Sequence, residues 1–142
     1  MESTSLWVLL RLQFYSTTQG RVPFNVIECK RLDANNQHGT TGLNAEYIQN
    51  GISRFISQRY TTYDNTAGMI GFIVEKMDAH QNVLAINTLL EQHFSYINTE
   101  RLLTSKTIVS DFEYSYFSRH RVDGVSKIIY HLMFDFSDNI TP

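Results

Sequence analysis

The chain has 142 residues, of which 42% are hydrophobic and 18% are charged, and its formal net charge is −2 at pH 7. This composition excludes a disordered chain, and the length suits one domain with its own core but not two typical domains. The single cysteine, Cys29, excludes an internal disulfide and a cysteine-based zinc cluster. The net negative charge gives no general attraction to nucleic acid, so any contact with DNA requires a local basic patch.

The apolar runs are short. The two longest, residues 6–10 and 69–74, are far below the length that spans a membrane. The first ten residues contain no Lys or Arg, and Arg11 follows the first apolar run, which reverses the order found in a signal peptide. We therefore expect no membrane association and a cytoplasmic location.

Two strands are predicted at the start of the chain. Residues 6–15 begin apolar and then alternate, and residues 24–32 combine apolar and β-branched residues after Pro23. A polar loop over residues 33–42 follows. A helix is predicted over residues 43–56, because its apolar side chains recur at the spacing of one helical face.

A central strand and a second helix are predicted next. Residues 68–75 are almost wholly apolar, which is typical of a strand covered on both faces. Asp78 can cap a helix with Gln81 as its capping-box partner, and an apolar stripe follows over residues 83–94. The helical connection from strand 24–32 makes it parallel to strand 68–75.

The last part of the chain is predicted to form a hairpin. Strand-like runs cover residues 108–117 and 127–136, and Asp123-Gly124 between them is a strong turn signal. The order ββαβα followed by a ββ hairpin predicts an α/β fold, with a mixed β-sheet of about five strands flanked by α-helices. We expect residues 1–142 to form this single domain.

Glu28 and Lys30 suit phosphodiester chemistry. They alternate with Cys29 on a predicted strand, so their side chains project from one face about 7 Å apart. A carboxylate can hold Mg²⁺, which lowers the pKa of a bound water, and an ammonium can stabilise negative charge that develops on a phosphate. The alternative is a plain salt bridge at the exposed end of a strand, since Glu-x-Lys tripeptides are common.

Several segments resemble one nuclease family. They are Val26-Ile27-Glu28-Cys29-Lys30-Arg31-Leu32; the helix residues Asn44, Tyr47, Gly51, Arg54 and Phe55, followed by Tyr60; Gly68-Met69-Ile70-Gly71-Phe72; and, more weakly, Ser118-x-His120 with Ile129-Tyr130-His131-Leu132. The first segment resembles the E-x-K half of the motif of the PD-(D/E)xK nuclease superfamily. Together, the segments resemble uncharacterised bacterial members of this superfamily.

This resemblance implies a restriction-endonuclease-like fold and a nuclease that uses Mg²⁺ or Mn²⁺ to act on DNA, in bacterial defence or DNA processing. Glu28 would bind the metal, and Lys30 would assist the attacking water or stabilise the transition state. Arg54 and Tyr47 would be supporting contacts. Members of the superfamily commonly carry additional N-terminal helices, so we expect a form that lacks this extension.

The chain departs from the family motif at the second metal ligand. The superfamily places an acidic residue, usually Asp, on the strand before the E-x-K strand, whereas Glu2 is the only acid upstream of Glu28. Gln13 is predicted to stand in the place of this Asp and to be the second metal ligand. An amide oxygen is a weaker ligand for Mg²⁺ than a carboxylate. Glu46, on the helix that follows, is an alternative acid.

Two non-hydrolytic alternatives stay open. The missing acid favours a catalytically silent nuclease-like scaffold that binds a protein partner or nucleic acid. A small basic cluster would suit a phosphate backbone, and the alternative is a solvated face; it consists of Lys30, Arg31, Arg54 and Arg59. A small-molecule-binding α/β domain would instead have a closed apolar pocket. The apolar run 6–10 is either core or the face of a homodimer.

The five histidines are scattered, and no two have the helical spacing of a zinc site. His131 lies inside an apolar strand and is expected to be a hydrogen-bonded histidine of the core or of an edge. Cys29 points away from the face of Glu28 and Lys30, so we expect it to be buried and unreactive.

Overall fold

The computed structural model describes residues 8–13, 24–57 and 65–139, with the backbone alone for residues 8–13 and 24–26. The elements in chain order are β1 (Val8–Gln13), β2 (Phe24–Leu32), α1 (Leu43–Tyr47), a π-helical turn η1 (Ile48–Ile52), α2 (Ser53–Ile56), β3 (Thr66–Ile73), α3 (Ala79–Gln92), a 3-10 turn η2 (Ser95–Ile97), β4 (Thr99–Ser105), β5 (Ser115–Val122), β6 (Val125–Asp135) and a 3-10 turn η3 (Ser137–Asn139). Within these ranges, no helix has the length and apolar character to cross a membrane.

The six strands form one mixed sheet in the order β1-β2-β3-β6-β5-β4. The strands β2, β3 and β6 are parallel to one another, and the other neighbouring pairs are antiparallel. The predicted α/β class, the parallel pairing of β2 with β3 and the inner position of β3 are therefore confirmed. The sheet has one strand more than the five expected.

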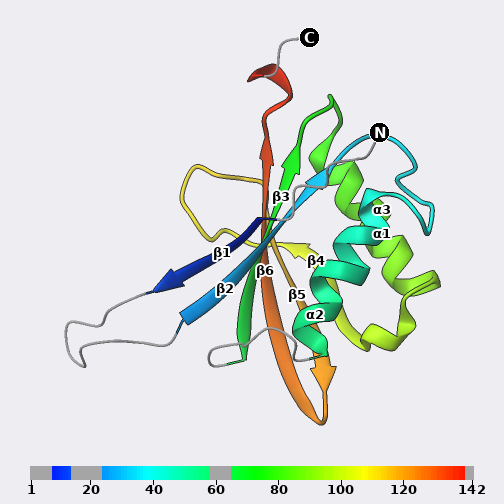
Figure 1. Cartoon of the computed structure of the whole chain (residues 1–142), viewed down its shortest axis with the longest axis vertical. Coiled ribbons are helices and arrows are strands. Elements are labelled where there is room, and N and C mark those ends of the chain that lie inside the picture. Colours follow the sequence, from blue (N-terminus) through cyan, green and yellow to red (C-terminus); the bar gives the residue numbers. More distant parts are fainter. Residues whose placement is uncertain (1–7, 14–23, 58–64, 140–142) are drawn as a thin grey trace.

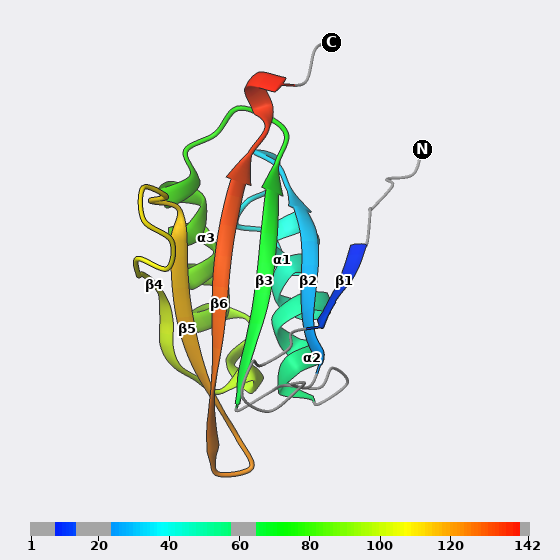
Figure 2. The ribbon, with the colours of Figure 1, turned by 90° about the vertical axis from the view of Figure 1, so that its left-hand side faces the viewer.

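Helices cover one face of this sheet. Figure 1 shows α1, α2 and α3 on the same side, and Figure 2 looks onto the opposite face, where none of the described helices lies. Burial along β3 alternates accordingly: Met69, Gly71 and Ile73 are buried, whereas Ile70 and Phe72 on the opposite face are half-buried. The prediction that this strand is covered on both faces is wrong for the described part of the chain.

The strand predicted over residues 108–117 is also wrong. Ile108 and Val109 are strand-forming residues, but they lie in a loop with exposed fractions of 40% and 53%, and β5 begins only at Ser115. The sequence signal for β4 is weak because this edge strand buries Leu103 alone. The predicted hairpin turn is confirmed at Asp123 (φ 51°) and Gly124 (φ 80°), since positive φ at both central residues is typical of a type I′ turn.

The predicted helix over residues 43–56 is interrupted by η1 in its middle. Gly51 allows this turn to approach the sheet, because a Cβ at this position would lie 2.3 Å from Met69 Cε. The same Cβ would lie 3.9 Å from Lys30 Cε. The helix therefore packs directly on the part of β2 that carries Glu28 and Lys30.

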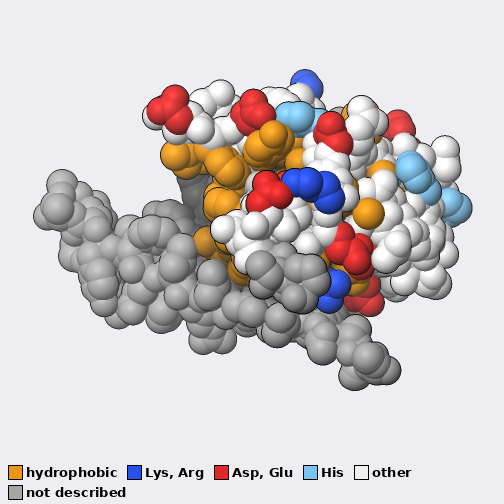
Figure 3. Space-filling model, turned by 90° about the horizontal axis from the view of Figure 1, so that it is seen from above, with side chains coloured by type: hydrophobic (Ala, Val, Ile, Leu, Met, Phe, Trp, Pro, Cys, Tyr) orange, Lys and Arg blue, Asp and Glu red, His pale blue; other side chains and the backbone are white. Residues whose placement is uncertain are grey.

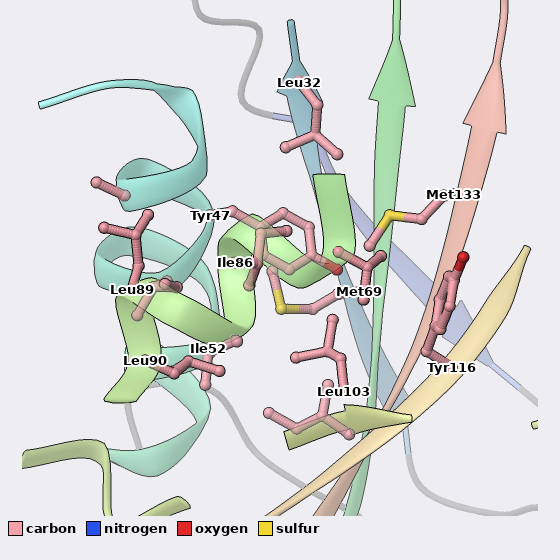
Figure 4. Close-up of a cluster of buried hydrophobic side chains, with 14 of the residues drawn as sticks. Leu32, Tyr47, Ile52, Met69, Ile86, Leu89, Leu90, Leu103, Tyr116 and Met133 are labelled. Carbon is pink, nitrogen blue, oxygen red and sulfur yellow. The ribbon is translucent and has the colours of Figure 1, made fainter. Parts of the chain in front are cut away.

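The core fills the space between the helices and the sheet. Figure 4 shows Tyr47 from α1 and Ile86 from α3 next to Met69 of β3, with Leu89 and Leu90 of α3 turned toward the neighbouring helix, and all five are buried. Two amide contacts hold the helices in place. Asn44 and Asn82 exchange hydrogen bonds of 2.8 and 3.0 Å between α1 and α3. The amide of Asn87 accepts a hydrogen bond of 2.9 Å from the backbone N of Leu103 on β4 and donates one of 3.0 Å to its backbone O.

Candidate active site on the helix-covered face

Glu28 and Lys30 lie side by side under the helices. Lys30 Nζ is 2.9 Å from Glu28 Oε1, and the two residues are 3% and 1% exposed. Strand alternation places both side chains on one face, as predicted. The pair is not a salt bridge at an exposed strand end, because α1, η1 and α2 cover this face of β2.

Arg54 joins this pair from α2. Its guanidinium Nη1 lies 3.8 Å from Glu28 Oε1, and its side chain is 31% exposed. The Glu28 carboxylate therefore has a buried ammonium on one side and a partly solvated guanidinium on the other. We refer to Glu28, Lys30 and Arg54 as the Glu28 cluster.

Burial and charge act in opposite directions on Lys30. Burial lowers the pKa of its ammonium, and the hydrogen bond to Glu28 counteracts that shift. The carboxylate of Glu46 on α1 also favours the charged ammonium, and it accepts a hydrogen bond of 2.7 Å from Asn50 Nδ2. The alternative acid predicted from the sequence thus lies near Lys30, where it supports the ammonium.

Gln13 is not opposite Glu28 in the sheet. The antiparallel register pairs Leu9 with Glu28 and Gln13 with Phe24. Phe24 precedes Glu28 by four residues, or about 13 Å along the strand. The side chain of Gln13 lies outside the described residues, so its predicted role as a metal ligand stays a prediction.

Around Glu28, the described residues supply cations. None of their His, Cys, Asp and Glu side chains form a group of three or more that could hold a metal ion. Mg²⁺ requires octahedral oxygen coordination and usually one or two carboxylates. Glu28 instead contacts two cations, and a divalent cation there would have to replace them.

Tyr47 belongs to a different cluster from the one predicted. Its hydroxyl lies 2.7 Å from His131 Nδ1, His131 Nε2 lies 2.8 Å from Ser118 Oγ, and Ser118 Oγ lies 2.9 Å from His120 Nε2. His120 Nδ1 lies 3.0 Å from Thr99 Oγ1. These five residues form a hydrogen-bonded chain from α1 across β6 and β5 to β4, and the prediction that His131 is a hydrogen-bonded core histidine is confirmed.

The two histidines of this hydrogen-bonded network, His120 and His131, are neutral at pH 7. Burial lowers the pKa of His131 to about 3 and that of His120 to about 4. Burial also raises the pKa of the Tyr47 phenol well above its usual value. The hydroxyl of Ser118 lies between the two Nε2 atoms and can donate its proton to only one of them. The two imidazoles must therefore be opposite tautomers, one protonated at Nε2 and the other at Nδ1.

The remaining predictions for this strand have mixed outcomes. Cys29 is buried on the face opposite Glu28, and burial raises the pKa of its thiol, so it is unreactive as expected. Lys30 and Arg31 point to opposite faces of β2, and Lys30 is buried. The predicted basic cluster of Lys30, Arg31, Arg54 and Arg59 is therefore wrong as a continuous surface, and Arg59 lies outside the described residues.

Comparisons with protein-family models, with curated proteins and with solved structures give no significant match to this chain. The structure itself defines the fold as α/β, with a mixed sheet that the described helices cover on one face. The resemblance of residues 26–32 to the PD-(D/E)xK nucleases stays a prediction from the sequence.

Proposed function

We propose that the chain is a catalytically silent, nuclease-like scaffold that binds a partner. The observation that carries this proposal is the Glu28 carboxylate, which is buried between Lys30 and Arg54. A metal ion at Glu28 would have to break this buried ion pair and would place a divalent cation beside the buried ammonium. Removing one partner of a buried ion pair lowers the free energy of unfolding by about 3–5 kcal/mol.

The Glu28 cluster then has a structural role. Arg54 connects α2 to β2 through Glu28, and Gly51 brings η1 close to Lys30 on the same strand. These contacts fix how the helices lie on the sheet. The cytoplasmic setting expected from the sequence belongs to this proposal, since the lone cysteine is buried and has no disulfide partner.

The second candidate function is a Mg²⁺- or Mn²⁺-dependent nuclease that acts on DNA. One observation favours it: Glu28, Lys30 and Arg54 converge on one side of β2, and Arg54 is exposed enough to contact a phosphate. In this case Glu28 would bind the metal, and Lys30 would act on the water or the phosphate.

A cleavage assay separates the two functions. The wild type, Glu28→Gln and Lys30→Met are incubated with plasmid and with single-stranded DNA in Mg²⁺, Mn²⁺ or EDTA, and Glu91→Gln, at an exposed acid on α3, is the matched control. We expect no cleavage above the EDTA background for any variant. Metal-dependent cleavage that Glu28→Gln abolishes and Glu91→Gln retains would contradict a silent scaffold.

A further inference from the structure

The face of the sheet opposite the helices has an apolar floor with a hollow in it. One row of residues across four strands is Ile27, Gly68, Tyr130 and Phe117, which are neighbours in register. Because Gly68 has no side chain, a hollow of about 370 Å³ opens beside Tyr130. Its size is within the range of small-ligand pockets. Figure 3 looks down onto the upper end of the sheet and shows hydrophobic side chains there, on the side away from the helices.

Three cations lie at one end of this row. The Arg101 guanidinium and the Lys106 ammonium are each 5.7 Å from the centre of the Phe117 ring. Arg119 follows Phe117 by two residues on β5 and therefore shares its face. Arg101 and Lys106 are exposed, and Arg119 is half-buried. We call Arg101, Lys106, Phe117, Arg119 and Tyr130 the aromatic–basic surface.

The pairing of two of these cations suggests an anionic ligand. Arg101 on β4 and Arg119 on β5 are paired in register, and like charges directly opposite each other destabilise a sheet. The neighbouring carboxylate of Glu100 is held by Arg121 Nε at 2.5 Å and by Ser126 Oγ at 2.7 Å, and Arg119 also acts on it at longer range, since it helps to lower the pKa of Glu100. An anion that contacts Arg101 and Arg119 together would relieve their repulsion.

We propose that the aromatic–basic surface binds single-stranded nucleic acid. Unpaired bases stack on aromatic side chains of open sheets, and basic side chains beside them hold the phosphates. Here a base would lie in the hollow against Tyr130, and the backbone would cross Phe117 to reach Arg101, Lys106 and Arg119. The inference rests on the proposed binding role and gives the class of partner.

Other occupants fit this surface less well. A second copy of the chain, packed face to face, would bring the same three cations against an equally basic face. In a duplex, the bases are stacked on one another, so neither the hollow nor the Tyr130 ring would have a base to receive. The net charge of −2 does not oppose the proposal, because charges beyond about 8 Å are largely screened at physiological salt.

The test is fluorescence anisotropy with labelled oligo-dT, oligo-U and a DNA duplex over a series of salt concentrations. We expect the single strands to bind and the duplex to bind at least tenfold more weakly. The triple variant Arg101→Gln/Lys106→Gln/Arg119→Gln should weaken single-strand binding more than tenfold and reduce the slope of log K against log salt by about 2, which is 0.7 for each of three phosphate contacts. Lys76→Gln, at an exposed lysine outside this surface, should leave the slope unchanged.

Variants of Tyr130 test the stacking. Tyr130→Leu should weaken binding by roughly 5- to 150-fold, the range for one stacked base, and Tyr130→Phe should bind like the wild type. Circular dichroism verifies that each variant is folded, and the triple variant carries the test if Tyr130→Leu does not fold. Binding that is absent at 50 mM salt, that survives the triple variant or that is equally strong for the duplex overturns the proposal. Whether the scaffold is silent is judged separately, by the cleavage assay.

Discussion

Removal of one partner from the buried pair in the Glu28 cluster should strongly destabilise the fold. In Glu28→Gln, the Lys30 ammonium stays in place at 3% exposure but loses the carboxylate that lies 2.9 Å away. A buried charge that loses its counter-ion costs about 3–5 kcal/mol. For a chain of 142 residues, this corresponds to a fall in Tm on the order of 10 °C.

Urea unfolding followed by far-UV circular dichroism measures this free energy of unfolding. The double variant Glu28→Leu/Lys30→Met removes both charges and should recover most of the loss, since replacing a whole buried pair by apolar residues is often neutral or stabilising. Lys76→Met is the matched control, because it breaks the exposed pair of Lys76 with Asp138 and should have no measurable effect. If Glu28→Gln is as stable as Lys76→Met, the Glu28 carboxylate is not held in a buried ion pair, and the reasoning is refuted.

Three further predictions concern the helix-covered face. Burial lowers the folded-state pKa of His120 to about 4 and that of His131 to about 3, below the unfolded value of about 6.5. The free energy of unfolding should therefore be highest above pH 6.5 and fall at lower pH by up to about 1.4 kcal/mol per pH unit for each histidine. A urea midpoint that stays the same between pH 6.5 and 5 would be inconsistent with this. Long-range ¹H–¹⁵N NMR should find these two imidazoles as opposite neutral tautomers, and two identical tautomers would rule out the chain through Ser118. Gly51→Ala places a methyl group 2.3 Å from Met69 Cε, and the overpacking cost of about 1–3 kcal/mol should cancel or exceed the gain of about 1 kcal/mol that Ala brings to a helix. A higher Tm in thermal unfolding would show that the helix does not approach the sheet here.

The sequence predicts the parts of this fold that depend on local signals. Strand alternation places Glu28 and Lys30 on one face, a helix between two apolar strands makes β2 and β3 parallel, and Asp123-Gly124 marks a tight turn. Each of these inferences uses residues that are neighbours in the chain, and the structure agrees with each of them.

The burial of the Glu28 cluster could not be read from the same signals. It depends on which face of the sheet the helices cover, and this is decided by packing between distant segments. The series of hydrogen bonds that links Tyr47 to Thr99 through His131, Ser118 and His120 is a further example. It joins four elements, and Tyr47 and His131 are separated by 84 positions in the sequence. The sequence shows Ser118-x-His120 and His131, but the hydrogen bond that joins them through Ser118 Oγ becomes apparent only when β5 pairs with β6.

The sequence does not indicate the aromatic–basic surface, because it gives no signal for β4. This edge strand is polar and buries one side chain, so the segment that carries Arg101 and is followed by Lys106 has no strand signal. The strand predicted over residues 108–117 also misplaced the start of β5 and hence the pairing of Phe117 with Tyr130. With a net charge of −2, any nucleic-acid contact requires a local basic patch, and the sequence predicts it beside Lys30. The structure instead gathers Arg101 and Lys106 at Phe117, with Arg119 on the same strand as Phe117, on the opposite face.

Calorimetric titration of the wild type with Mn²⁺ is the most direct test of the central claim that Glu28 is a structural ion-pair partner and not a metal ligand. The account predicts no heat beyond dilution, because the carboxylate is buried between Lys30 and Arg54 and the described residues supply no group of acidic ligands around it. Binding of one Mn²⁺ per chain that Glu28→Gln abolishes and Glu91→Gln retains would contradict the claim and would support the nuclease.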